Sequence, residues 1–175
     1  KEYVNGYYNV DPSSSEKISK ILAELREQLG IPHGSWNGGI PNIKGVQFSQ
    51  ITQILGALET AKLPTMVRLA KESLNNVTAD SSPKVVLFVW LKSSIKYLME
   101  ELALYNPLPI SGDVPNKKRE SYINAFNDAS DKYRVIIAIV SAGGIGISLD
   151  DRDGRFPRTA YCIPHYFFIS MYQAT

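Results

Sequence analysis

Two short stretches of the chain, residues 85–91 and 135–140, consist entirely of apolar residues and are rich in β-branched or aromatic side chains. An unbroken apolar strand is typical of a parallel sheet covered on both faces, because a strand with one wet face alternates between apolar and polar residues. Both stretches fall well short of the roughly 18 residues that a membrane-spanning helix needs. We therefore expect a buried parallel β-sheet and no membrane span.

Helical patterns alternate with strands in the second half of the chain. A helix is predicted directly after the first apolar strand, and a short strand follows at residues 108–111. Pro115 opens the next helix, which leads to the second apolar strand. A last short strand is predicted at residues 159–163, with a helix starting near Ile169. This order predicts an α/β fold with right-handed crossovers between parallel strands.

The first half of the chain is predicted to contain helices and a loop but no sheet. A helix of about 15 residues is expected after Pro12, where apolar residues recur at helical spacing. Residues 30–46 contain seven glycines and prolines, which predict a loop or linker. Two further helices are expected, one from Ser49 and one after Pro64, because proline suits a first helical turn.

Composition narrows the possible functions. The 175 residues include 19 basic and 17 acidic side chains, a net charge of +2, which excludes a histone-like or tail-like nucleic-acid binder and leaves a local basic groove open. The single cysteine, Cys162, excludes an internal disulfide and fits a reducing compartment. The two histidines, His33 and His165, have no metal-ligand spacing, which argues against a zinc site.

Polar residues follow three of the predicted strands, at the ends where open parallel sheets bind ligands. The three segments are residues 90–94, 111–113 and 141–151. Hydroxyls, a lysine and closely spaced glycines in them are competent phosphate contacts. Each segment also has a simpler interpretation without a ligand. Ser93 and Ser94 could cap one helix and Asp113 another, and the glycines could form only a turn.

Several enzyme classes fit these residues poorly. A dinucleotide site needs an amphipathic helix after its glycines, whereas the charged residues 150–158 follow here. Cys162 and His165 could form a thiol nucleophile pair, but their apolar neighbours favour roles in the core and a turn. The sequence contains no Gly-x-x-x-x-Gly-Lys-Ser/Thr phosphate loop, so any use of ATP would require another domain.

Four segments follow one another in an order that is more specific than any one of them. They are residues 84–92, the block Gly112, Arg119, Phe126 and Asn127, residues 135–149, and residues 172–174. In that order they resemble motif IV, the Gly…Arg…Phe-Asn block, motif V and the opening of motif VI in the second RecA-like lobe of superfamily 2 helicases. The similarity is closest to Swi/Snf-like translocases and related viral helicases. Residues 59–74 also resemble the segment that leads into this lobe.

The resemblance implies a RecA-like parallel sheet flanked by helices and preceded by a helical N-terminal segment. It divides the chain into three parts. These are an N-terminal helix with a Gly/Pro-rich loop of unassigned role (1–47), a helical segment leading into the lobe (48–82), and the helicase C-terminal lobe, truncated within motif VI (83–175). An intracellular protein is expected, with a viral origin as one option and neither nucleus nor cytoplasm preferred.

The function implied by the resemblance is that of one half of an ATP-dependent motor. A companion N-terminal RecA-like lobe of the same protein would hold ATP and magnesium, and nucleotide hydrolysis would drive movement along DNA or RNA. The residues expected at the nucleic-acid backbone are Lys92, Ser93, Gly112 and Ser141. The residues expected to face ATP are Gly144, Gly146, Ser148 and Gln173.

The sequence departs from the family at three points. Ser141 replaces a usual cation, Ser148 replaces a frequent asparagine, and two arginines of motif VI would lie beyond Gln173. Because those arginines stabilise the transferring phosphoryl group, the chain is expected to hydrolyse no ATP alone. Two alternatives stay open: a non-catalytic nucleic-acid- or protein-binding module on the same scaffold, and a dinucleotide or sugar-nucleotide enzyme using the glycine-rich loop.

Overall fold

The computed structural model describes residues 9–29, 48–140, 148–149, 151 and 154–163. The chain divides into two compact units, residues 1–65 and 66–175. None of the helices in the described part of the chain combines the length and the apolarity that crossing a membrane requires. The helix expected near Ile169 lies outside the described residues.

The described part of the first unit consists of helix α1 (Pro12–Leu29) and the beginning of helix α2 (Phe48–Asn75). The helix predicted after Pro12 is therefore confirmed. Apolar side chains spaced three or four residues apart on each helix pack against one another, because this spacing places them on one helical face. The side chains in this cluster include Ile54 and Leu58 of α2 and Ile18, Ile21 and Leu22 of α1.

The two helices predicted on either side of Pro64 are one continuous helix, so the predicted break is wrong. Proline inside a helix removes one N–H donor and crowds the preceding turn, at a cost of about 3 kcal/mol. Ala61 and Val67, on either side of the proline, are both buried. Packing of an apolar face stabilises a helix more than local propensity does, so the helix continues through the proline.

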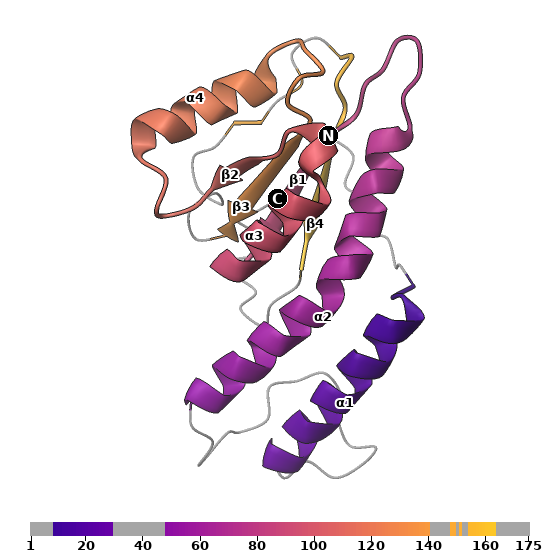
Figure 1. Cartoon of the computed structure of the whole chain (residues 1–175), viewed down its shortest axis with the longest axis vertical. Helices are drawn as coiled ribbons and strands as arrows, with labels where there is room; N and C mark the ends of the chain where they lie inside the picture. The colour runs from indigo at the N-terminus through magenta and orange to yellow at the C-terminus, as the bar shows by residue number, and fades with distance from the viewer. Residues whose placement is uncertain (1–8, 30–47, 141–147, 150, 152–153, 164–175) are drawn as a thin grey trace. The chain divides into compact units, whose positions relative to one another are not determined.

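Among its described residues, the second unit has a four-stranded parallel sheet at its centre (Figure 1). Its strands are β1 (Lys84–Val89), β2 (Leu108–Ile110), β3 (Val135–Ile139) and β4 (Arg158–Cys162). They lie in the order β2-β3-β1-β4, and every neighbouring pair is parallel. The predicted α/β fold and its parallel sheet are confirmed, and so are the four predicted strands, to within one or two residues at each end.

One face of the sheet is covered by α4 (Asn116–Asn127). Phe126 of this helix is fully buried against even-numbered residues of the two central strands, such as Phe88 and Ala138. Tyr122 and Ile123, predicted with Phe126 on the apolar side of the helix, pack against the same cluster.

The opposite face is covered by α3 (Lys92–Glu101) and by the last turns of α2 (Figure 1). α3 contacts β1, β2 and β3 but adds no residue to the cluster beneath α4. Tyr161 of β4 stands opposite Leu87 in the sheet, and its hydroxyl lies 2.7 Å from the Ser73 hydroxyl of α2. Helices therefore shield both faces of the sheet from solvent, which explains why the central strands are apolar throughout.

Lys84, the first residue of β1, is a buried cation with no exposed surface. Its ammonium Nζ donates to the carbonyls of Phe126 at 2.6 Å and Asp128 at 2.9 Å, and it lies 4.7 Å from the ring centre of Phe156. Carbonyls at the end of a helix have no partner within the helix, and the helix dipole favours a cation there. Lys84 thus fastens the end of α4 to the sheet.

Burial lowers the pKa of Lys84 from 10.5 to about 8, and the nearby Arg158 charge acts in the same direction. The unfolded chain then binds the Lys84 proton more tightly than the folded chain, so this group makes folding more favourable as the pH rises from 8 towards 10.5. We predict that the unfolding free energy of the wild type, relative to Lys84→Met, rises by about 1–3 kcal/mol between about pH 7 and pH 10.

Urea unfolding of both proteins across this pH range measures the difference, because every other titrating group is shared and cancels. Two curves that stay parallel from neutral to alkaline pH would contradict the prediction. They would mean that the Lys84 ammonium keeps its ordinary affinity for a proton in the folded chain.

Candidate nucleic-acid interface

The four strands are parallel, so their carboxyl ends meet at one edge of the sheet, which we call the carboxyl edge. β1 leads directly into α3 at this edge, and β2 leads into α4 through residues 111–115. Lys92, Ser93 and Gly112, predicted from separate segments, therefore lie at the same edge, on the connections that follow β1 and β2. Four other predicted site residues lie outside the described part of the chain; they are Ser141, Gly144, Gly146 and Gln173.

An ion pair joins two of these connections. The Lys92 ammonium Nζ lies 2.8 Å from Oδ1 and 2.7 Å from Oδ2 of Asp113, and both side chains are about two-thirds exposed. One interpretation of Asp113 was a cap on α4, and this interpretation is wrong: Pro115 occupies the cap position and makes no side-chain hydrogen bond to the helix start. The carboxylate binds a cation from another strand end instead.

Ser93 and Ser94 do not cap α3 either, because the helix begins at Lys92, one residue before them. Leu91 occupies the cap position, and its carbonyl accepts the Ser94 N–H at 3.1 Å. Ser94 is buried, whereas Ser93 is exposed in the first turn. The hydroxyl of Ser93 thus lies at the surface beside the helix N-terminus, where backbone N–H groups and the dipole favour an anion.

Gly112 lies on a connection that is held by Arg119. The Arg119 guanidinium donates through Nε to the Val114 carbonyl at 2.7 Å and through Nη2 to the Gly112 carbonyl at 3.4 Å. Gly112 has no positive φ, and a Cβ placed on it would meet no atom within 4 Å. Neither its conformation nor its packing requires glycine, so the space beside it is open to a ligand.

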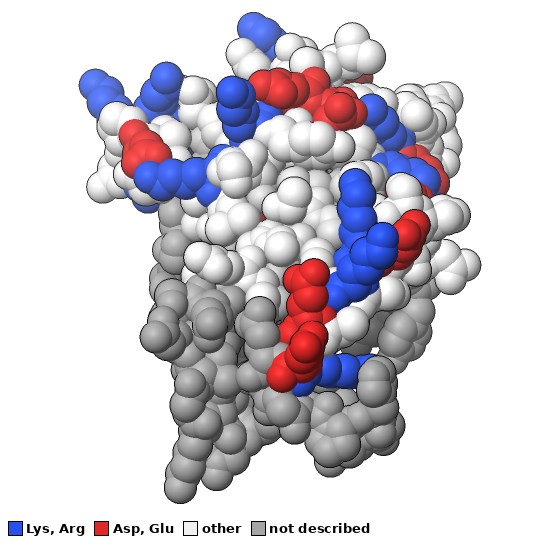
Figure 2. Space-filling view, turned by 60° about the horizontal axis from the view of Figure 1, so that its bottom comes forward, with Lys and Arg blue, Asp and Glu red and all other residues white. Residues whose placement is uncertain are grey.

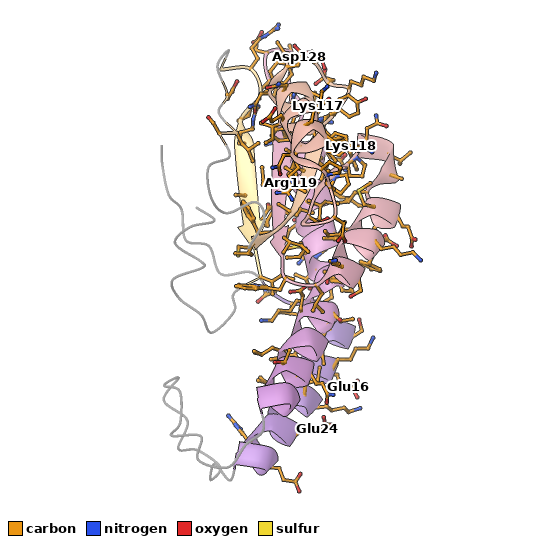
Figure 3. All side chains as sticks on the ribbon, turned by 90° about the vertical axis from the view of Figure 1, so that its left-hand side faces the viewer. Glu16, Glu24, Lys117, Lys118, Arg119 and Asp128 are labelled. Carbon is orange, nitrogen blue, oxygen red and sulfur yellow. The ribbon has the colours of Figure 1, made fainter. Side chains whose placement is uncertain are left out.

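Two cations that the sequence analysis did not single out lie at the same edge. Lys117 and Lys118 occupy the first turn of α4 and are exposed (Figure 3). No acidic residue lies in the first turn of α3 or α4. A cation at the positive end of a helix dipole costs about 0.3–1 kcal/mol. The available signal in the sequence was the run of three basic residues at 117–119, which begins two residues after Pro115.

On the face that Figure 2 presents, Lys and Arg side chains are interspersed with Asp and Glu, and no broad field of one sign is present. This agrees with the small net charge of +2. A net charge this small does not by itself indicate nucleic-acid binding, so it is the placement of the basic residues at the two helix starts that points to this edge.

Ser148 lies apart from this group. Its carbonyl accepts a hydrogen bond from Nδ2 of Asn127, the last residue of α4, at 2.8 Å. That end of the helix is the one fastened by Lys84 at the start of β1, opposite the carboxyl edge. Within the described residues, Ser148 is thus not brought together with Lys92, Ser93 and Gly112.

The described residues include no cluster of three side chains suited to hold a metal ion. Cys162 is half-buried, and its Sγ lies 3.7 Å from the Ile163 carbonyl, whereas His165 is outside the described part. The described residues therefore offer neither a magnesium site nor an assembled thiol nucleophile.

Comparison with known proteins identifies the family to which the chain is similar. Residues 65–153 match the family described as the helicase conserved C-terminal domain. The chain is 27% identical over 92 residues to transcription termination factor 2 of Drosophila melanogaster, a match covering 51% of this chain. The chain spans only 8% of the length of that relative.

Two solved structures are similar in fold. One is the Sulfolobus solfataricus SWI2/SNF2 ATPase C-terminal domain, with a TM-score of 0.56 and 16% identity over 98% of this chain and 84% of that one. The other is the C-terminal part of the Fun30 ATPase domain, with a TM-score of 0.49 and 12% identity over 97% and 88% of the two chains. The first similarity supports the RecA-like arrangement of the sheet.

We predict that Gly112→Ala folds with a stability within about 0.5 kcal/mol of the wild type, or slightly above it, because alanine reduces the entropy of the unfolded chain. The measurement is a urea unfolding curve at neutral pH. Gly154→Ala is the matched control, since Gly154 has a φ of +72° and should lose stability when a side chain is added. A large loss at Gly112 would mean that the connection itself requires glycine.

Proposed function

The chain belongs to the helicase conserved C-terminal domain family, and on that basis we propose that it is the nucleic-acid-binding lobe of an ATP-dependent helicase or translocase. The predicted resemblance to the C-terminal lobe of superfamily 2 helicases is confirmed by the family match, which covers residues 65–153, and by the fold similarity. The polymer bound, the coupling to ATP and the part played by each residue belong to the proposal.

The observation that carries the proposal is the placement of cations at the carboxyl edge. Lys92, Lys117 and Lys118 stand in the first turns of two helices, where the dipole already contributes positive charge. The lysine charges and the positive ends of the helix dipoles repel one another. A bound phosphate backbone would relieve this repulsion, because its negative charges would interact favourably with both the lysines and the helix N-termini. Ser93 and Ser141 would each add a hydroxyl that can bond to phosphate. Gly112 would let the phosphate backbone come close to the chain, because the space beside it is open. Contacts of this kind position a strand without reading its sequence.

ATP would be the substrate of the whole motor rather than of this chain alone. We propose that a companion N-terminal RecA-like lobe holds ATP and magnesium, because the described residues carry no metal-binding cluster and the sequence has no phosphate loop. The residues proposed to face ATP are Gly144, Gly146, Ser148 and Gln173. Hydrolysis would open and close the cleft between the lobes and move the bound strand.

The competing proposal is a binding module that uses the same scaffold without any motor. A fold alone does not establish an activity, and both proposals share the same fold and the same candidate interface. They differ in whether ATP hydrolysis is coupled to binding. A binding module would hold nucleic acid or protein with the same affinity whether or not ATP is present. The motor reading requires ATP hydrolysis that nucleic acid stimulates.

We predict that the chain binds single-stranded DNA or RNA with little sequence preference. Lys92→Met should weaken binding about three- to tenfold at low salt and reduce the slope of log affinity against log salt by about one, because one phosphate contact is lost. Fluorescence anisotropy of labelled oligonucleotides measures both quantities. Lys132→Met is the control, since Lys132 is an exposed lysine just ahead of β3, away from the carboxyl edge.

Equal weakening by Lys92→Met and Lys132→Met would show that binding depends only on net charge and would remove the support for this edge. No binding to either polymer at low salt, by a chain that circular dichroism shows to be folded, would contradict the nucleic-acid function.

We further predict that the isolated chain hydrolyses no ATP, and that a protein carrying both lobes hydrolyses ATP faster with nucleic acid present. In that protein, Ser141→Ala and Gly144→Ala should lower the stimulated rate by about tenfold or more. Ser141→Ala removes a hydroxyl proposed to contact the nucleic acid, and Gly144→Ala adds a methyl group where the backbone is proposed to approach ATP, and both changes disturb a site that must assemble for catalysis. A phosphate-release assay with and without nucleic acid measures the rate. An unstimulated rate in the two-lobe protein would favour the binding module.

A further inference from the structure

The fold does not require the ion pair between Lys92 and Asp113. Lys92 follows β1 and Asp113 follows β2, two strands that β3 separates in the sheet. The pair therefore reaches across the carboxyl end of β3, in the middle of the candidate nucleic-acid interface. Both side chains are exposed, and an exposed ion pair contributes about 0–1 kcal/mol to stability. Its position is better explained by binding than by folding.

Asp113 is an acidic side chain among the cations of this edge. It lies next to the open space beside Gly112, and four residues further on the first turn of α4 carries Lys117 and Lys118. An interface for a phosphate backbone gains nothing from a carboxylate, which repels phosphate. The carboxylate oxygens of Asp113 accept hydrogen bonds from the Lys92 ammonium, as the oxygens of a bound phosphate would.

We propose that Asp113 is an affinity-setting residue whose carboxylate competes with backbone phosphate for the Lys92 ammonium. A strand that reaches Lys92 must displace Asp113, and when the strand leaves, Asp113 takes its place. The contact is thus exchangeable, which suits a lobe that has to release the strand after each step. This inference rests on the proposed function, because it concerns the same nucleic-acid contact.

The opposite role makes the opposite prediction. If Asp113 served to orient the Lys92 ammonium towards phosphate, its neutralisation would free the lysine side chain and weaken binding. If Asp113 competes, its neutralisation makes Lys92 available and tightens binding. Asparagine has nearly the shape of aspartate, so Asp113→Asn changes the charge with little change in packing. The direction of the change in affinity therefore distinguishes the two roles.

The experiment uses the 175-residue chain and labelled single-stranded DNA and RNA of about 20 nucleotides, at about 50 mM and 200 mM salt. The variants are Asp113→Asn, Lys92→Met and the double variant, with Asp80→Asn as the matched control. Asp80 is an exposed carboxylate in the connection before β1, at the other edge of the sheet. Thermal unfolding of each variant checks that it is folded.

Asp113→Asn should tighten binding about three- to tenfold at the lower salt and steepen the salt dependence by about one contact, whereas Asp80→Asn should change affinity less than twofold. In the Lys92→Met background, Asp113→Asn should have a much smaller effect, because the cation for which it competes is gone.

Three results would overturn the inference while leaving the proposed function intact. These are unchanged or weaker binding by Asp113→Asn, an equal effect of Asp80→Asn, and an undiminished effect of Asp113→Asn without Lys92. Folded wild type and Asp113→Asn that both fail to bind DNA or RNA at low salt would overturn the nucleic-acid function itself, and the role of Asp113 with it.

Discussion

The second unit depends on one constraint, which is that a parallel sheet must be shielded from water on both faces. Even-numbered residues of β1 and β3, such as Phe88 and Ala138, meet α4, and the other face meets α3 and the end of α2. Two of these helices, α3 and α4, begin where the preceding strand ends. The helix starts, with their polar and charged residues, therefore gather at one edge as a consequence of apolar packing.

α4 connects the core to this edge. Phe126 and the carbonyls that bind Lys84 fasten its last turn to the sheet, while Arg119 holds the connection at Gly112 ahead of its first turn. Because a helix is stiff, burial at one end determines where Lys117 and Lys118 stand at the other. The Gly…Arg…Phe-Asn block is thus explained by structure: its arginine and asparagine hold neighbouring backbone, and its phenylalanine anchors the helix.

Predictions from the sequence succeeded where they rested on an extended apolar pattern. They failed where they rested on a single residue, a proline or a polar side chain, whose role depends on its surroundings in the fold. The strands agree to within one or two residues, because a buried strand excludes polar side chains over its whole length. Pro64 was expected to begin a helix and lies inside one, since packing on both sides outweighed the local cost. A helix cap was one interpretation of Asp113, but its carboxylate binds an ammonium from another strand end instead. Lys117 and Lys118 were not predicted as site residues, because their position at the carboxyl edge depends on where α4 begins.

The sequence by itself determined the parallel α/β class and the family, because apolar strands and ordered motifs are properties of the linear chain. Only the tertiary structure decided which polar groups meet. Lys92 and Asp113 are 21 residues apart, and Lys84 and Phe126 are 42 apart. Their contacts follow from the strand order β2-β3-β1-β4 and from the helix that each strand end leads into. That order results from packing free energy summed over the whole sheet, and no local stretch of residues contains it.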